Sequence, residues 1–150
     1  MSSSISQILT PERTLLGAQC TSKKRVIEYI SGFLADKIDD SQSDEIYEKL
    51  IAREKLGSTG IGEGIAIPHS RLQECDDTLG ALFVLDQAVD FDAIDRKPVD
   101  IVFVLLVPEE ATEQHLQTLS MLAQKFNDGD FRNTLRQATS SEDLYQKVIQ

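Results

Sequence analysis

Two runs of apolar residues constrain the fold of this chain more than any other feature. They read Leu-Gly-Ala-Leu-Phe-Val-Leu at 79–85 and Asp-Ile-Val-Phe-Val-Leu-Leu-Val at 100–107. An apolar run without alternation is typical of a strand that is covered on both faces, because neither face then has to meet water. We therefore expect a single α/β domain in which helices pack over a central β-sheet.

The other expected elements follow from apolar periodicity and from capping residues. In chain order they are short strands at Ile8-Leu9 and Leu15-Leu16, a helix at 23–37 capped by Ser22, a helix that begins after Ser41 with Asp44 as a capping-box residue and ends at Gly57, a strand at Ile65–Ile67, a helix at 113–127 capped by Thr112, a short helix at 131–136 and a last helix after Ser140. The apolar face of the helix at 113–127 is formed by Leu116, Leu119, Leu122, Ala123 and Phe126.

The composition favours a cytoplasmic protein that binds no nucleic acid and inserts into no membrane. At 150 residues, with 41% hydrophobic content, the chain suits one domain with a substantial core. Its 25 acidic and 15 basic residues leave a formal charge of −10, which repels nucleic acid and favours a protein partner with a basic docking face. No apolar run is long enough to span a membrane, no signal pattern opens the chain, and Cys20 and Cys75 are isolated, as reduced thiols are.

The segment from Gly57 to His69 is the main candidate for a functional site. It places four glycines within eight positions, followed by a short apolar run and Pro68-His69. Glycines let backbone N–H groups approach an anion, and the proline restricts the backbone where the histidine is presented. This pattern favours chemistry on a phosphoryl group. The alternative is a glycine-rich turn before a strand that ends in a structural histidine.

His115, the second of the two histidines, falls in the first turn of the helix expected at 113–127. The N–H groups and the dipole at a helix start favour a bound anion, so His69 would attack phosphorus while His115 stabilises negative charge. The alternative for His115 is a residue that faces solvent. Dinucleotide, Walker A and serine-hydrolase motifs are missing, and His69, Glu74, Cys75 and His115 lack the spacing of a zinc site, so no metal or cofactor is expected.

Longer stretches of the chain resemble a known family. They are Ala52-Arg-Glu-Lys-Leu-Gly-Ser-Thr-Gly-Ile-Gly-Glu-Gly-Ile-Ala-Ile-Pro-His69, Phe91-Asp-Ala-Ile-Asp95 with Pro98-Val-Asp100, Leu105-Leu-Val-Pro108, His115-Leu-Gln-Thr-Leu-Ser120 and Leu144-Tyr145. These stretches are similar to the IIA domains of the bacterial phosphoenolpyruvate-dependent phosphotransferase system (PTS), in the mannitol/fructose class, and most of all to its nitrogen-regulatory branch. The resemblance covers residues 1–150 as one domain, with a core at about 5–149.

The resemblance implies a phosphotransferase component with a central mixed sheet flanked by helices. It implies that His69 becomes a tele-phosphohistidine, accepting the phosphoryl group from the HPr-like phosphocarrier NPr, which enzyme I of the nitrogen branch charges. His115 would stabilise the phosphate, and Arg53 would add positive charge. The remaining phosphate-pocket residues that it implies are Ser58, Gly60, Gly62 and Gly64.

The branch of the family decides what the phosphate does. In the nitrogen branch, phosphorylation controls binding to regulatory targets such as potassium-transport or sensor-kinase proteins. The alternative is a stand-alone IIA component that passes phosphate to a IIB domain of a sugar system. Ser70 departs from the glycine that commonly follows the family's histidine, which puts the transfer rate in question more than the chemistry.

Overall fold

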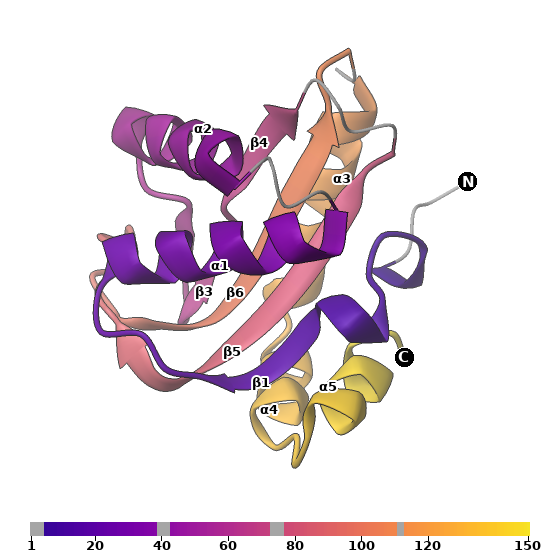
Figure 1. Ribbon diagram of the computed structural model, residues 1–150. Coiled ribbons are helices and arrows are strands. Elements are labelled where there is room, and N and C mark those ends of the chain that lie inside the picture. Colours follow the sequence, from indigo (N-terminus) through magenta and orange to yellow (C-terminus); the bar gives the residue numbers. More distant parts are fainter. Residues whose placement is uncertain (1–4, 39–42, 73–76, 111–112) are drawn as a thin grey trace.

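The two apolar runs form the central antiparallel pair of a mixed sheet in the computed structural model (Figure 1). They are β5 (Leu79–Val89) and β6 (Val99–Pro108). The sheet order is β1-β5-β6-β3-β2, and β4 also pairs with β6. β1 runs parallel to β5, β3 and β4 run parallel to β6, and β2 is antiparallel to β3. The expected α/β class with a mixed sheet is confirmed.

The structure describes residues 5–38, 43–72, 77–110 and 113–150, and of residues 37, 38, 43 and 113–115 it describes the backbone alone. The other elements are the 3₁₀ helices η1 (Ile5–Gln7) and η2 (Pro11–Arg13), β1 (Thr14–Ala18), α1 (Lys23–Ile38), α2 (Ser43–Leu56), β2 (Gly60–Gly62), β3 (Ile65–Ala66), β4 (His69–Leu72), α3 (Glu113–Phe126), α4 (Gly129–Arg136) and α5 (Ser141–Val148). No helix within these ranges is long and apolar enough to cross a bilayer.

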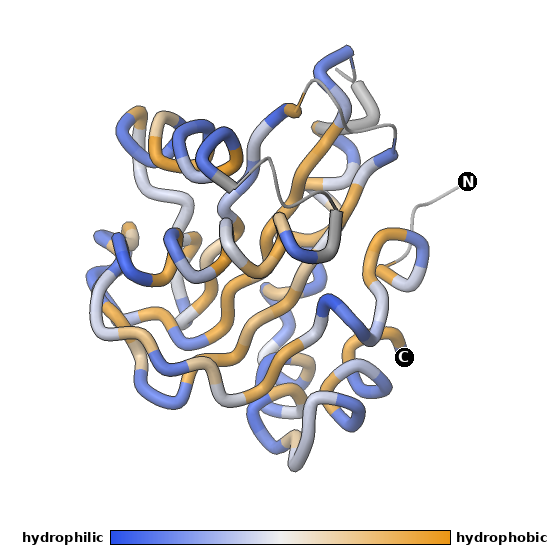
Figure 2. The backbone as a smooth tube through the Cα atoms, viewed as in Figure 1, coloured by the Kyte–Doolittle hydropathy of each residue, from blue (hydrophilic) through white to orange (hydrophobic). Residues whose placement is uncertain are grey.

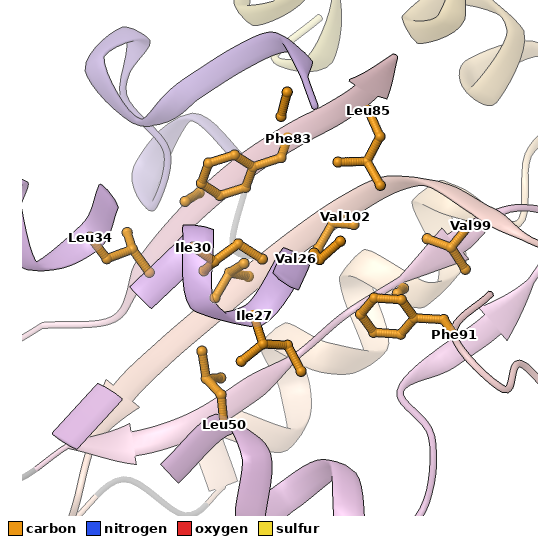
Figure 3. Close-up of a cluster of buried hydrophobic side chains, with 14 of the residues drawn as sticks. Val26, Ile27, Ile30, Leu34, Leu50, Phe83, Leu85, Phe91, Val99 and Val102 are labelled. Atoms are coloured by element: carbon orange, nitrogen blue, oxygen red, sulfur yellow. The ribbon is translucent and has the colours of Figure 1, made fainter. Parts of the chain in front are cut away.

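Side chains of β6 alternate between two hydrophobic clusters, one on each face of the sheet. Val102 and Val104 pack with residues of α1 and α2, whereas Ile101 and Phe103 pack with residues of α3, α4 and α5. Figure 3 shows the first cluster, where Phe83 of β5 lies among side chains of α1. Burial of each large apolar side chain stabilises the fold by about 1.5–3 kcal/mol. Apolar residues accordingly follow the central strands in Figure 2, and both faces are covered as expected.

Most of the helices begin and end near the expected residues. The hydroxyl of Ser22 accepts from the N–H of Arg25 at 3.2 Å, and that of Ser140 accepts from the N–H of Asp143 at 3.0 Å. These bonds satisfy N–H groups that the first helical turn leaves without an intrahelical partner. The caps expected at Ser41 and Thr112 lie outside the described residues.

Two expectations need correction, and two strands were not expected. Ile8-Leu9 is no strand: the N–H of Leu9 bonds back to the carbonyl of Ile5 at 2.9 Å after a 3₁₀ turn, and both residues are buried. A short apolar pair carries no periodicity, so it cannot separate a strand from a buried turn. Leu116 is 65% exposed and does not join the buried face of α3. The strands β2 and β4 were not expected, because each is too short to show alternation.

Candidate functional site

His69 is held in place by its position at the start of β4. The preceding strand β3 and β4 itself both pair with β6, with Ile65 opposite Ile101 and His69 opposite Leu105. Between them, the carbonyl of Pro68 accepts from the N–H of Leu105 at 2.9 Å. The backbone on both sides of the histidine is therefore anchored to a central strand of the sheet.

The imidazole of His69 is hydrogen-bonded at both ring nitrogens. Nδ1 lies 2.8 Å from the carbonyl oxygen of Ile67, and Nε of Arg53 donates to Nε2 at 3.1 Å. A carbonyl oxygen only accepts, so Nδ1 carries the proton and Nε2 keeps its lone pair. Burial lowers the pKa of His69, and the charge of Arg53 lowers it too, against the Ile67 bond and Glu54, which raise it. The lowered pKa favours the uncharged ring, in which Nε2 carries the lone pair that a nucleophile needs.

A pocket of about 420 Å³ opens beside His69 and Arg53. Arg53 lies in the last turn of α2, where its Nη1 donates to the carbonyl of Gly57 at 2.8 Å. The full lining is Lys49, Ala52, Arg53, Leu56, His69, Ser70 and Arg71. Three of these side chains are cationic, so the surroundings of His69 are basic although the chain carries a charge of −10. Such a pocket suits an anion.

Ser58 and Gly60 make internal contacts in this structure. The hydroxyl of Ser58 donates to the carbonyl of Phe91 at 2.5 Å and accepts from the N–H of Gly60 at 3.0 Å. A Cβ added at Gly60 would lie 2.8 Å from the Cβ of Ala93. The two residues dock the start of β2 onto the loop after β5, and neither lines the pocket beside His69. Their expected role at a phosphate stays a prediction.

Gly62 ends β2 just before the two-residue turn of the β2–β3 hairpin, and Gly64 is the second residue of that turn. Glu63 and Gly64 have φ of 57° and 83°, the left-handed combination that type I′ turns require. The N–H of Glu63 donates to Asp95 at 2.8 Å, and a Cβ on Gly64 would come within 2.4 Å of Arg136 Nη2. These glycines serve a tight turn and a close side-chain approach here, and their phosphate role also stays a prediction.

His115 belongs to α3, as expected, but its side chain lies outside the described part of the chain, as do Glu74 and Cys75. The pairing of His115 with His69 therefore stays a prediction. Among the described residues, no group of three His, Cys, Asp or Glu side chains could hold a metal ion.

Ser70 lies in β4, opposite Leu106 of β6, and it also lines the pocket. The non-glycine residues with positive φ in the described ranges are Glu63, Asp92 and Arg96, so Ser70 keeps a backbone conformation open to any residue. The fold therefore needs no glycine after the histidine.

Glu54 is the site residue to which the sequence pattern assigned no role. It is 8% exposed, and its carboxylate accepts from the backbone and hydroxyl of Thr59. Ile46, Leu50 and Glu54 follow one another at four-residue spacing, so Glu54 continues the buried stripe of α2. A charge on an apolar stripe was the signal that could have identified it.

Comparison with known proteins agrees with this geometry. The family model "Phosphoenolpyruvate-dependent sugar phosphotransferase system, EIIA 2" matches residues 7–150. A nitrogen regulatory protein of Pseudomonas aeruginosa is 50% identical, covering 97% of this chain and 94% of the relative. A fructose-specific EIIA component of the PTS from Haloferax volcanii is 32% identical and covers 97% of each chain.

Among solved structures, the nitrogen regulatory protein IIA-Ntr from Neisseria meningitidis superposes with a TM-score of 0.88. It is 40% identical, and the match covers 96% of this chain and 98% of that one. The chain therefore belongs to the EIIA 2 family of the phosphoenolpyruvate-dependent sugar phosphotransferase system.

Proposed function

We propose that this protein is a nitrogen-regulatory IIA protein that accepts a phosphoryl group on Nε2 of His69 from the HPr-like carrier NPr. The observation that carries the proposal is the state of the imidazole: its Nδ1 proton is bound to the carbonyl of Ile67, and its Nε2 lone pair lies beside Arg53 at a basic pocket. This is the tautomer that tele phosphorylation requires. The 50% identical nitrogen regulatory relative supports the branch.

In the proposed transfer, the lone pair of His69 Nε2 forms a bond to phosphorus as the N–P bond of the carrier's phosphohistidine breaks. The electron pair of that bond returns to the carrier's imidazole, and each ring keeps the one N–H proton it had. Arg53 gives up its bond to Nε2 and turns its donors toward the phosphoryl oxygens, which suit its planar fork. His115 is proposed to stabilise the same oxygens, on the family resemblance.

Lys49 and Arg71 contribute through charge. They line the pocket with Arg53, and transfer of a phosphoryl group depends chiefly on positioning and on electrostatic stabilisation. The incoming group adds a charge of about −2 at pH 7, which offsets these cations and changes the face that a partner meets. We propose that regulatory targets, such as potassium-transport or sensor-kinase proteins, distinguish the two charge states.

The experiment is intact-mass measurement after incubation with phosphoenolpyruvate, enzyme I and each candidate carrier. A gain of one acid-labile phosphate is expected, and it should disappear in His69→Ala and slow in His115→Ala. A gain that persists in His69→Ala would overturn the assigned acceptor. For regulation, pull-down of each target class with phosphorylated and unphosphorylated protein should give unequal binding, and equal binding of both forms at every salt concentration would contradict it.

A sugar-specific role is the second candidate, favoured by the 32% identical fructose-specific relative. Under that function, the phosphate on His69 would pass to the IIB domain of a sugar system. Mixing the phosphorylated protein with such IIB domains separates the two functions, because rapid loss of phosphate to a IIB domain supports transport and retention supports regulation.

A further inference from the structure

Glu54 is a buried carboxylate beside the proposed acceptor that the transfer chemistry does not use. Its side chain is 4% exposed, and taking a carboxylate out of water is costly unless close partners compensate. It directly follows Arg53 in the last turn of α2. Close partners must therefore compensate this carboxylate.

The partners of Glu54 come from two other parts of the chain. Nζ of Lys23, in the first turn of α1, lies 2.7 Å from Oε2. On the other oxygen, the backbone N–H of Thr59 donates to Oε1 at 3.1 Å, and the Thr59 hydroxyl donates to the same atom. Thr59 is 4% exposed, so this contact is sheltered from water and strengthened by the low local dielectric.

Thr59 in turn leads to the histidine. Its carbonyl accepts from the N–H of Ile67 at 3.0 Å, and the carbonyl of the same Ile67 lies 2.8 Å from Nδ1 of His69. The path runs from the carboxylate to the threonine, from there to Ile67, and from Ile67 to the imidazole. Each step is a hydrogen bond, and both ring nitrogens trace back to the last turn of α2.

We propose that Glu54 is a positioning residue for His69, which holds the Ile67 carbonyl through Thr59 and so keeps the imidazole in the form with its proton on Nδ1. Arg53, its neighbour in the chain, holds Nε2 directly. If the carbonyl moves, the proton can shift to Nε2, and the ring then has no lone pair at the atom proposed to take the phosphoryl group. The consequence for transfer rests on the proposed function of His69, whereas the effect on the ring does not.

The experiment follows the imidazole of His69 in the unphosphorylated protein by long-range ¹H–¹⁵N NMR, which distinguishes the two neutral tautomers. Wild type should show the Nδ1–H form. Glu54→Gln and Thr59→Val should show a mixture with the Nε2–H form. Because the Glu54 charge raises the pKa of His69, Glu54→Gln should also move its titration to lower pH. Transfer from the carrier should slow roughly tenfold or more, as expected for a displaced reacting group.

Two variants control for a general loss of structure. Glu48→Gln removes a carboxylate from an exposed position of the same helix and should leave the tautomer, the titration and the transfer rate unchanged. Thr59→Ser keeps the hydroxyl and should restore the wild-type ring signals that Thr59→Val loses. If Glu54→Gln fails to fold, the ring signals of Thr59→Val and Thr59→Ser still test the proposal.

The inference is overturned if the wild type lacks the Nδ1–H form, or if folded Thr59→Val and Glu54→Gln both keep wild-type ring signals. Failure of the proposed function looks different. In that case no carrier phosphorylates the wild type, although the ring signals still change in the variants as described.

Discussion

Two parts of the Gly57–His69 segment differ in what surrounds them: the hairpin turn at its centre, called the hairpin end, and its last residues, called the histidine end. At the hairpin end (Gly62–Gly64), the turn is fixed by Asp95 on one side and by Arg136, whose guanidinium donates to the Glu63 carbonyl at 2.8 Å and to both oxygens of Asp100. At the histidine end (Ile67–His69), both ring nitrogens are bonded and a basic pocket opens. A single sequence motif thus contains one end that anchors the fold and one end suited to chemistry.

The difference shows that a glycine-rich stretch beside a histidine need not be a ligand cradle along its whole length. At the hairpin end, the absence of Cβ atoms makes room for neighbouring protein groups, and the N–H of Glu63 is already used by Asp95. The pKa of Asp95 is lowered by the N–H bonds from Glu63 and Lys97, so the carboxylate stays charged. A phosphate there would meet a negative charge.

The largest stability effect is expected from Gly64→Ala. The new Cβ would lie 2.4 Å from Arg136 Nη2 at a φ of +83°, so strain and crowding together should cost about 2–4 kcal/mol of the free energy of unfolding. Urea denaturation measures this cost. Gly32→Ala, in the interior of α1 where the added Cβ would meet nothing within 4 Å beyond the local helix backbone, is the matched control and should stabilise by up to about 1 kcal/mol.

The transfer rate of Gly64→Ala should change far less than its stability, provided that it is measured where the variant is folded. A loss of phosphorylation as large as that of His69→Ala would show that the hairpin also takes part in phosphoryl transfer.

Arg53→Lys should change the transfer rate far more than the stability, which is the reverse of what we expect for Gly64→Ala. A lysine cannot reach both His69 and the Gly57 carbonyl with a planar fork, so the initial rate of phosphorylation should fall roughly tenfold to a hundredfold. Unfolding free energy should change by less than about 0.5 kcal/mol, as for other partly exposed substitutions. Lys55→Gln, an exposed change in the same helical turn, should alter neither quantity, and a wild-type rate in Arg53→Lys would remove Arg53 from the site.

Arg136→Met is expected to have a smaller effect at the hairpin end. The side chains of Arg136 and Asp100 are 30% and 27% exposed, so the pair should contribute about 1 kcal/mol. The stability difference from wild type should shrink in 1 M salt, because salt screens the ion pair. Urea denaturation at low and at high salt measures this, since urea itself carries no charge. A salt-independent difference would indicate that the bond to the Glu63 carbonyl matters more than the ion pair.

The smallest effects should appear on changing pH, and the two ends should respond in separate windows. The lowered pKa of His69 means that the unfolded state binds its proton first as pH falls from 6.5, so stability decreases from there to the folded pKa of His69. Asp95, also with a lowered pKa, contributes stability that is lost only below its unfolded value of 3.8. In His69→Asn, the loss of stability just below pH 6.5 should disappear, while the loss below pH 3.8 should remain; urea denaturation across this pH range measures both. A wild-type profile in this variant would show that a group other than His69 causes the loss below pH 6.5.

Sequence patterns predicted the larger elements well, because their signals are local. β5, β6 and the helices carry apolar runs or a 3.6-residue period within a single element, and Ser22 and Ser140 mark two of the helix starts. Where a segment is too short to show a period, prediction fails. Ile8-Leu9 became a buried turn, and β4 was not expected, since its pairing with β6 is specified by residues far along the chain.

For the site, the sequence by itself determined that a histidine is presented after a proline beside a glycine-rich turn, in a chain with buried strands and no metal-binding spacing. Only the tertiary structure decided which ring nitrogen holds the proton, that Glu54 is buried and bonded to Thr59, and that the glycines of the hairpin face Asp95 and Arg136. The reason is physical. Strand and turn preferences act over a few residues, whereas the bonds from Arg53 to His69 and from Arg136 to Glu63 join residues 16 and 73 positions apart and exist only once the whole core has packed.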